Sequence, residues 1–172
     1  MDNQYGELMK VSEKTLIKLY EDHNDMLYRY AFRYLSRDYL AEECVSDVFI
    51  RFLQKVRKEG FPKGNITAYL YRIAHNWIVD YYRKRKPDEL IEPGEIMDPN
   101  PSPEMRVFRT ERVEKLQKAL LSLPEEQRIV VDLHIMENWS HEKVANHLGK
   151  TVEASRALKY RALKNLRNII EP

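Results

Sequence analysis

Apolar residues recur three and four positions apart along the first part of the chain, which places them on one side of an α-helix. A first helix is expected to open over residues 16–20, after a cap at Ser12. A second helix is expected to carry an apolar stripe over residues 27–35. No segment shows convincing strand alternation, so the pattern predicts an all-α protein.

The helical pattern continues in two further segments that a break separates. Asp38 is expected to cap a third helix, residues 60–64 supply the glycines and proline of the break, and Asn65 is expected to cap a fourth helix. The third helix is expected to bury Ala41, Val45, Val48, Phe49, Phe52 and Val56. The fourth is expected to bury Ile66, Tyr69, Leu70, Ile73, Ala74, Trp77, Ile78 and Tyr81. Together these helices predict a compact domain over residues 10–86.

Helical spacing resumes at residue 104 and runs to residue 170. Pro124 fits the first turn of a helix, where its missing N–H costs nothing. Ser140 is expected to cap a short helix, Gly149 to supply a tight turn and Thr151 to cap the next helix, which is the layout of a helix-turn-helix. The expected inner positions are Ile129, Val130, Leu133, Met136, Val144, Ala145, Leu148, Leu158, Ala162, Leu166 and Ile169.

The net charge of +2 conceals an uneven distribution. Residues 87–104 hold five prolines, six acidic residues and no Lys or Arg, whereas residues 83–86 are all basic. Proline removes backbone donors and like charges repel, so this stretch predicts a flexible acidic linker. Three parts are therefore expected: a domain at 1–86, the linker at 87–104 and a second domain at 105–172.

Several classes of protein are excluded by what the chain contains. A single cysteine, Cys44, cannot form an intramolecular disulfide, and its place on an apolar stripe predicts a buried, inert thiol. No apolar run is long enough to span a bilayer and no signal core opens the chain, so a cytoplasmic protein without membrane insertion is expected. His141 and His147 are six residues apart, on different sides of a helix, so a shared metal is not expected. No cofactor is expected either. No enzymatic signature is present.

The second helix of the helix-turn-helix predicts a surface that binds duplex DNA. The start of such a helix enters the major groove, where Arg156 is placed to pair with a guanine edge. Lys150 and Lys164 are better suited to phosphates. The alternative is an ordinary helical hairpin with a solvated basic face. The candidate residues are Lys150, Thr151, Glu153, Arg156, Lys159, Tyr160, Arg161 and Lys164.

The outer face of the fourth helix mixes aromatic, cationic and amide side chains. Rings can stack on bases while cations follow the backbone, so this face suits single-stranded nucleic acid. The alternative is that the tyrosines are half-buried and that the basic end is merely solvated. The candidate residues are Tyr71, Arg72, His75, Asn76, Asp80, Arg83, Lys84 and Arg85. On the third helix, a charged patch of Glu42, Glu43, Asp47 and Arg51 is either a protein-docking surface or a soluble face.

Three segments, in this order, resemble a bacterial sigma factor of the extracytoplasmic-function type. The first is AEECVSDVFIRFLQKV at 41–56, which resembles region 2.2. The second is AYLYRIAHNWIVDYYRKRK at 68–86, which resembles the region 2.3–2.4 helix. The third is LSLPEEQRIVVDLHIMENWSHEKVANHLGKTVEASRALKYRALKNLR, ending at Arg167, which resembles region 4.

The resemblance implies a role for each feature. Region 2.2 would dock on the β′ clamp helices of core RNA polymerase, and region 4 would contact the β flap and the minus-thirty-five element. The region 2.3–2.4 helix would open and read the minus-ten element, with residues 57–65 capturing a flipped base. The linker would lie near the RNA path. Promoter DNA is thus an expected partner, and so is an anti-sigma factor.

The chain departs from the family pattern in places. Ser46-Asp47 replaces the usual Gln-Glu pair of region 2.2, Ser155 replaces a common valine of the recognition helix, and Tyr69 stands where many members have Trp. The resemblance predicts a factor that directs core polymerase to promoters and assists melting. The alternative is a free-standing regulator that binds an operator as a dimer. An enzyme or RNA-modifying accessory protein has no supporting residues.

Overall fold

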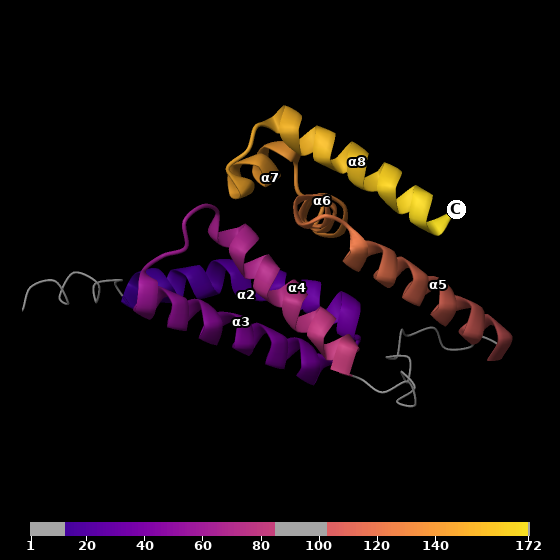
Figure 1. Ribbon diagram of the computed structural model, residues 1–172, viewed down its shortest axis with the longest axis horizontal. Coiled ribbons are helices and arrows are strands. Elements are labelled where there is room, and N and C mark those ends of the chain that lie inside the picture. The colour runs from indigo at the N-terminus through magenta and orange to yellow at the C-terminus, as the bar shows by residue number, and fades with distance from the viewer. Residues whose placement is uncertain (1–12, 85–102, 172) are drawn as a thin grey trace, which may run out of the picture. The chain divides into compact units, whose positions relative to one another are not determined.

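The computed structural model describes residues 13–84 and 103–171 (Figure 1). These residues form seven α-helices and one π-helical turn, and none of them lies in a strand, which confirms the all-α prediction. The chain divides into two compact units, residues 1–78 and 79–172. Most of the predicted linker, and Ser12, lie outside the described residues. In the described ranges, no helix has the length and apolar character needed to cross a membrane.

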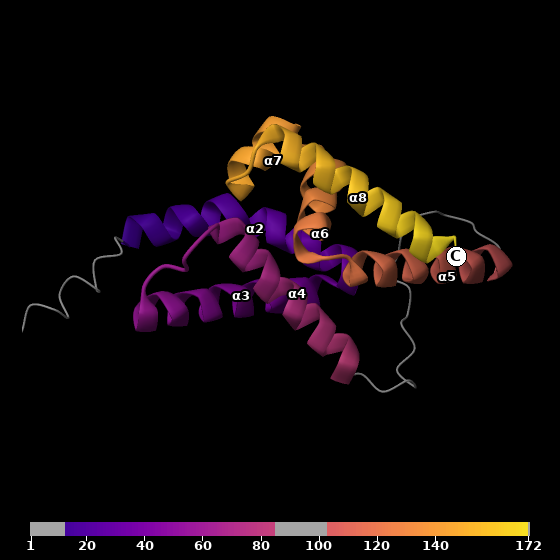
Figure 2. The same ribbon diagram turned by 45° about the horizontal axis from the view of Figure 1, so that its top comes forward.

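The first unit is built on two antiparallel helices, α2 (Glu13–Leu35) and α3 (Asp38–Glu59), which lie side by side in both views (Figures 1 and 2). The prediction of two helices before residue 36 was wrong, because α2 is continuous. Its polar middle, residues 21–25, contains neither glycine nor proline, so the helix has no reason to break there. Ser36, with φ 55°, then turns the chain into α3.

The third helix, α4 (Ile66–Lys84), belongs to this unit up to Ile78, and it packs against both α2 and α3. The rings of Tyr30 on α2 and Tyr71 on α4 meet edge to face, with their centroids 4.9 Å apart. His23 Nδ1 donates to the carbonyl of Leu19 at 2.9 Å, and its Nε2 lies 3.0 Å from the hydroxyl of Thr67. These contacts join α2 to the start of α4 and fix the angle at which α4 leaves the loop.

Of the three caps predicted in this unit, Ser12 lies outside the described residues, and the other two had different outcomes. Asn65 accepts a hydrogen bond from the backbone N–H of Ala68 at 2.9 Å, which confirms it as the cap of α4. Asp38 is not a cap: it is the first residue of α3, and Arg37 occupies the cap position without a side-chain bond. The carboxylate of Asp38 instead accepts a hydrogen bond from the hydroxyl of Tyr28. An acidic residue in the first turn still favours the helix dipole.

The second unit contains α5 (Pro103–Ser122), α6 (Glu125–Val131), the π-helical turn η1 (Asp132–Met136), α7 (His141–Leu148) and α8 (Val152–Ile170). Figure 1 shows α7 and α8 joined by a short turn, with α6 lying against α8. The buried apolar side chains are Ala119, Leu120, Leu123, Ile129, Val130, Val131, Leu133, Val144, Ala145, Leu148, Leu158, Ala162 and Leu166. Most of the expected inner face is therefore confirmed.

Two expected core residues of this unit are exposed. Met136 is 40% exposed because it ends the π-helical turn, whose wider backbone spacing rotates it away from the inner face of α6. Ile169 is 41% exposed in the last turn of α8, where the apolar periodicity continues beyond the core. Pro124 precedes α6 at the cap position rather than within its first turn, and it still removes no helical hydrogen bond.

Candidate nucleic-acid interface

The helix-turn-helix is fixed by the caps that the sequence predicts. Ser140 accepts a hydrogen bond from the N–H of Lys143 at 3.2 Å, and Thr151 accepts one from Ala154 at 3.1 Å. Gly149 adopts the left-handed conformation, with φ 61° and ψ 38°, that ends α7. Local hydrogen bonds thus set where α7 stops and where α8 begins.

One side of α8 presents a row of basic side chains to solvent. Arg156, Arg161 and Lys164 are exposed, and Tyr160 is 71% exposed between them. Glu153 is also exposed at the start of the helix. Lys150 is partly buried and forms an ion pair with Glu126 at 2.7 Å. The hydroxyl oxygen of Thr151 accepts the hydrogen bond from the N–H of Ala154, and the hydroxyl proton can still be donated to another group. This face can accommodate phosphates along several turns.

Lys159 differs from the other candidates on α8, because it is partly buried. Its Nζ lies 2.9 Å from Nε2 of His134, on η1. The ring of His134 stacks on that of His141, with centroids 4.0 Å apart, and Nδ1 of His141 lies 3.0 Å from the hydroxyl of Ser155. We call His134, His141, Ser155 and Lys159 the histidine cluster.

The histidine cluster explains why α8 carries a serine at a core position. Ser155 is only 1% exposed, and a buried hydroxyl without a partner is costly. His141, fourteen residues earlier, supplies that partner. Burial, then the nearby His134, Lys159 and Arg156, hold the pKa of His141 below its usual value of 6.5. Sequence reasoning missed this cluster, although a polar residue on an inner helical position was a signal for it.

The outer face of α4 is smaller than the sequence predicted. Arg72 and Asn76 are exposed, His75 is partly buried, and Asp80 pairs with Arg83 at 2.8 Å near the exposed Lys84. Arg85 lies outside the described residues. The remaining candidate, Tyr71, needs a correction.

Tyr71 does not belong to this face, because its side chain is fully buried against Tyr30. The physical reason is that α4 packs against α2 and α3 at once, so its buried surface is wider than a single stripe. Leu70 and Tyr71 are adjacent in sequence and both are buried. Conversely, four residues expected inside are only partly buried: Ile66, Tyr69, Trp77 and Tyr81.

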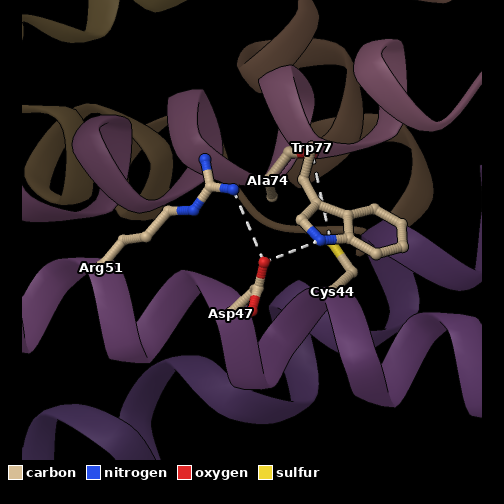
Figure 3. A network of polar contacts seen from close by, with 5 residues as sticks. All are labelled: Cys44, Asp47, Arg51, Ala74 and Trp77. Atoms are coloured by element: carbon tan, nitrogen blue, oxygen red, sulfur yellow. Dashed lines mark hydrogen bonds and ion pairs between the residues drawn. The ribbon is translucent and has the colours of Figure 1, made fainter. Parts of the chain in front are cut away.

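The charged patch of α3 is connected to α4 by a polar network (Figure 3). Trp77 Nε1 donates a hydrogen bond to Asp47 at 3.1 Å, and Arg51 forms an ion pair with the same carboxylate at 3.5 Å. Glu42 and Glu43 are exposed. Thus Asp47 belongs both to the surface and to the contact between two helices.

Cys44 lies beneath this network, with its sulfur 4.0 Å from the carbonyl oxygen of Ala74. Burial, with a smaller contribution from Asp47, raises the pKa of its thiol to about 12. The thiol therefore stays protonated, as the apolar pattern around it predicted. Within the described residues, no group of His, Cys, Asp and Glu side chains could hold a metal ion.

Comparisons with known proteins agree with this arrangement. Residues 19–87 match the family Sigma-70 region 2, and residues 113–166 match Sigma-70, region 4. The ECF RNA polymerase sigma factor BldN of Streptomyces coelicolor is 27% identical over 156 residues, which cover 89% of this chain and 59% of BldN. The ECF RNA polymerase sigma factor SigE of Mycolicibacterium smegmatis is 31% identical over 162 residues, which cover 89% of this chain and 60% of SigE.

The chain thus spans about three fifths of the length of these two relatives. Among solved structures, CnrH in complex with the cytosolic domain of CnrY is similar over 97% of this chain and 94% of that chain. The TM-score is 0.50 at 20% sequence identity, so this likeness concerns the fold.

Proposed function

The chain belongs to the sigma-70 family of RNA polymerase sigma factors, in its extracytoplasmic-function group, and on that premise we propose that it directs core RNA polymerase to specific promoters and assists their melting. The observation that carries the proposal is the order of the two family matches, region 2 over residues 19–87 and region 4 over residues 113–166. It is a specificity factor in the cytoplasm rather than a catalyst. The chemistry of RNA synthesis belongs to the polymerase.

The basic face of α8 binds the minus-thirty-five element in this proposal. Arg156 contacts base edges, because a guanidinium can form a forked pair with guanine in the major groove. Exposed cations such as Arg161 and Lys164 neutralise phosphates and hold the register. The proposed contacts are Lys150, Thr151, Glu153, Arg156, Lys159, Tyr160, Arg161 and Lys164.

The outer face of α4 captures the separated strand at the minus-ten element. The exposed amide of Asn76 suits a splayed base, and the cations beside it suit the backbone. The proposed contacts are Arg72, His75, Asn76, Asp80, Arg83, Lys84 and Arg85. Residues 57–65, which carry the partly exposed Phe61, are proposed to receive a flipped base, and binding must offset a flipping cost of about a few kcal/mol.

Core polymerase is the proposed protein partner. The face of Glu42, Glu43, Asp47 and Arg51 on α3 docks on the β′ clamp helices, and region 4 contacts the β flap. An anti-sigma factor is proposed as a second partner, on the family resemblance alone. A tagged chain should retain core polymerase from a lysate of its own host as a one-to-one complex.

The proposed division into domains at 1–86 and 105–172, with a linker at 87–104, can be tested separately. The described helix α5 begins at Pro103, close to the second of these boundaries. Limited proteolysis of the free chain should cut first within residues 87–104, because the composition of this stretch opposes a packed core. Stronger protection there than in α4 would contradict the division.

Run-off transcription tests the proposed function most directly. Purified chain is added to core polymerase on a panel of promoter fragments, with core polymerase alone as the control. Promoter-dependent transcripts of defined length are expected only when the chain is present. The operator-binding alternative is not favoured, because the N-terminal unit matches a sigma region. It would predict instead a dimer that binds palindromic DNA without polymerase.

A further inference from the structure

The contact between His134 and Lys159 is unusual for a helix proposed to bind DNA, since one of its cations is hydrogen-bonded to the protein itself. The Nζ atom of Lys159 lies 2.9 Å from Nε2 of His134. On the other side of the ring, Nδ1 lies 2.6 Å from the carbonyl oxygen of Trp139. His134 therefore bridges the turn before α7 and the second turn of α8.

These two partners determine which ring nitrogen carries the proton. A carbonyl oxygen can only accept, so Nδ1 of His134 must be the N–H donor toward Trp139. In the neutral ring, Nε2 then has a free lone pair directed at Lys159. An ammonium can only donate, so the Lys159–His134 hydrogen bond requires this tautomer and a neutral imidazole.

We propose that His134 is a positioning residue for Lys159: its neutral imidazole holds the ammonium at a fixed place on the DNA-facing helix, and one added proton releases it. The inference rests on the proposed binding of DNA by α8. A lysine side chain is flexible, and fixing it before DNA arrives lowers the conformational entropy lost on binding. One hydrogen bond from the ammonium leaves two N–H groups for phosphates.

Titratable and charged side chains surround the ring of His134 on two helices. The ring of His141 stacks on it from α7, and Lys159 faces it from α8. Arg156 on α8 adds positive charge near the stacked pair, and Glu142 on α7 opposes it. The pKa of the stacked His141 is lowered, chiefly by burial and then by His134, Lys159 and Arg156. A protonated His134 would direct an N–H at the ammonium, so the hydrogen bond would be lost.

The first test reads the tautomer without using DNA. The full chain, labelled with ¹⁵N-histidine, is studied by NMR at about pH 8, where an unperturbed histidine is neutral. The expected spectrum shows His134 protonated at Nδ1, and the same tautomer is expected in Lys159→Met because Trp139 still fixes it. Protonation of His134 at Nε2 in the wild-type chain would overturn the proposal.

The second test measures promoter affinity of the holoenzyme in a double-mutant cycle. His134→Ala and Lys159→Met are each expected to weaken binding about two- to tenfold, the range for one net hydrogen bond, and the double variant no more than the stronger single one. His147→Ala is the matched control, because its ring meets Trp139 rather than Lys159. Independent, additive losses, or wild-type affinity of His134→Ala, would overturn the proposal.

The pH profile separates positioning from a merely structural role. His134→Gln keeps a hydrogen-bond acceptor that does not titrate. Between about pH 7.5 and pH 5.5, holoenzyme with this variant should therefore lose less promoter affinity than the wild-type holoenzyme does. Parallel profiles would overturn the proposal. A wild-type holoenzyme that binds no promoter would overturn the proposed function and this role with it, and the tautomer spectrum would still report whether Nε2 of His134 has a lone pair to accept a hydrogen bond.

Discussion

The indole of Trp77 donates its Nε1–H to the carboxylate of Asp47 at 3.1 Å, and this bond joins α4 to α3. The same carboxylate pairs with Arg51 at 3.5 Å (Figure 3). Asp47 thus links the face proposed for polymerase docking, on α3, to the helix proposed for strand capture, α4. A substitution on this face can therefore weaken polymerase binding, destabilise the contact between α3 and α4, or do both, and the two effects have to be measured separately.

Glu43→Lys and Asp47→Lys are expected to differ, although both reverse a charge on the proposed docking face. Glu43 is exposed, so Glu43→Lys should weaken binding to core polymerase without changing the melting temperature of the chain. Asp47→Lys should also lower the free energy of unfolding by about 0.5–1.5 kcal/mol, because the hydrogen bond from Trp77 to this carboxylate is lost. A pull-down with core polymerase and thermal unfolding measure the two effects. Wild-type retention of core by Glu43→Lys would contradict the docking assignment.

Asn76→Ala is expected to impair open-complex formation and to leave closed-complex binding unchanged. Asn76 is exposed on α4, and its proposed target is a base on the separated strand. Permanganate reactivity of promoter thymines in the holoenzyme complex measures melting, and a mobility shift at low temperature measures closed-complex binding. If the variant melts every promoter as well as the wild type does, the base-reading role of Asn76 is withdrawn.

Arg156→Ala and Lys164→Ala should separate base reading from phosphate binding on α8. Arg156→Ala is expected to cost about 1–3 kcal/mol at a preferred promoter and to relax specificity at one or two base pairs. Lys164→Ala should weaken all sequences about equally and lower the salt dependence of binding by about one unit. Holoenzyme affinity for wild-type and substituted promoters, over a range of salt concentrations, tests both. Equal losses on all sequences for both variants would remove Arg156 from the base-reading set.

Tyr71 is expected to act through stability rather than through DNA. Its ring is fully buried against Tyr30, so Tyr71→Ala should lower the free energy of unfolding by about 3–5 kcal/mol. Tyr71→Phe keeps the ring and should transcribe at the wild-type level. Chemical denaturation and run-off transcription make the comparison. A stable Tyr71→Phe variant that fails in promoter melting would restore the hydroxyl to the candidate interface.

The stability of the second unit is expected to fall in mild acid because of His141. The folded-state pKa of His141 is lowered below 6.5, so the folded chain binds fewer protons than the unfolded chain. The stabilisation is present above pH 6.5 and is lost as the pH falls from there toward the lowered value. Thermal unfolding of the wild type between about pH 8 and pH 5 should show this loss, and His141→Gln should show less of it. Parallel profiles of the two proteins would contradict the expectation.

The sequence predicts most where a short-range rule determines the structure. The caps Asn65, Ser140 and Thr151 and the turn at Gly149 are local features, and the structure confirms all four. The prediction that Tyr71 is exposed was wrong, because it assumed that α4 buries one apolar stripe. A helix that packs against two neighbours buries a wider face than the apolar periodicity indicates.

Contacts between residues distant in sequence could not be predicted either. Asp47 meets Trp77 across thirty positions, and Lys159 meets His134 across twenty-five. Nothing in the sequence near either residue indicates its partner. The candidate interfaces were therefore predictable as lists of exposed residue types, but not as the networks that hold them.

Ser155 has a consequence for attempts to reprogram this protein. The buried hydroxyl of Ser155 contacts His141 on the preceding helix. Helix α8 therefore cannot be exchanged for that of another sigma factor without changing α7 as well. A graft of α8 from a relative with an apolar residue at this position would remove the hydroxyl that Nδ1 of His141 contacts. Promoter preference would then have to be transplanted with residues 132–170 as one block.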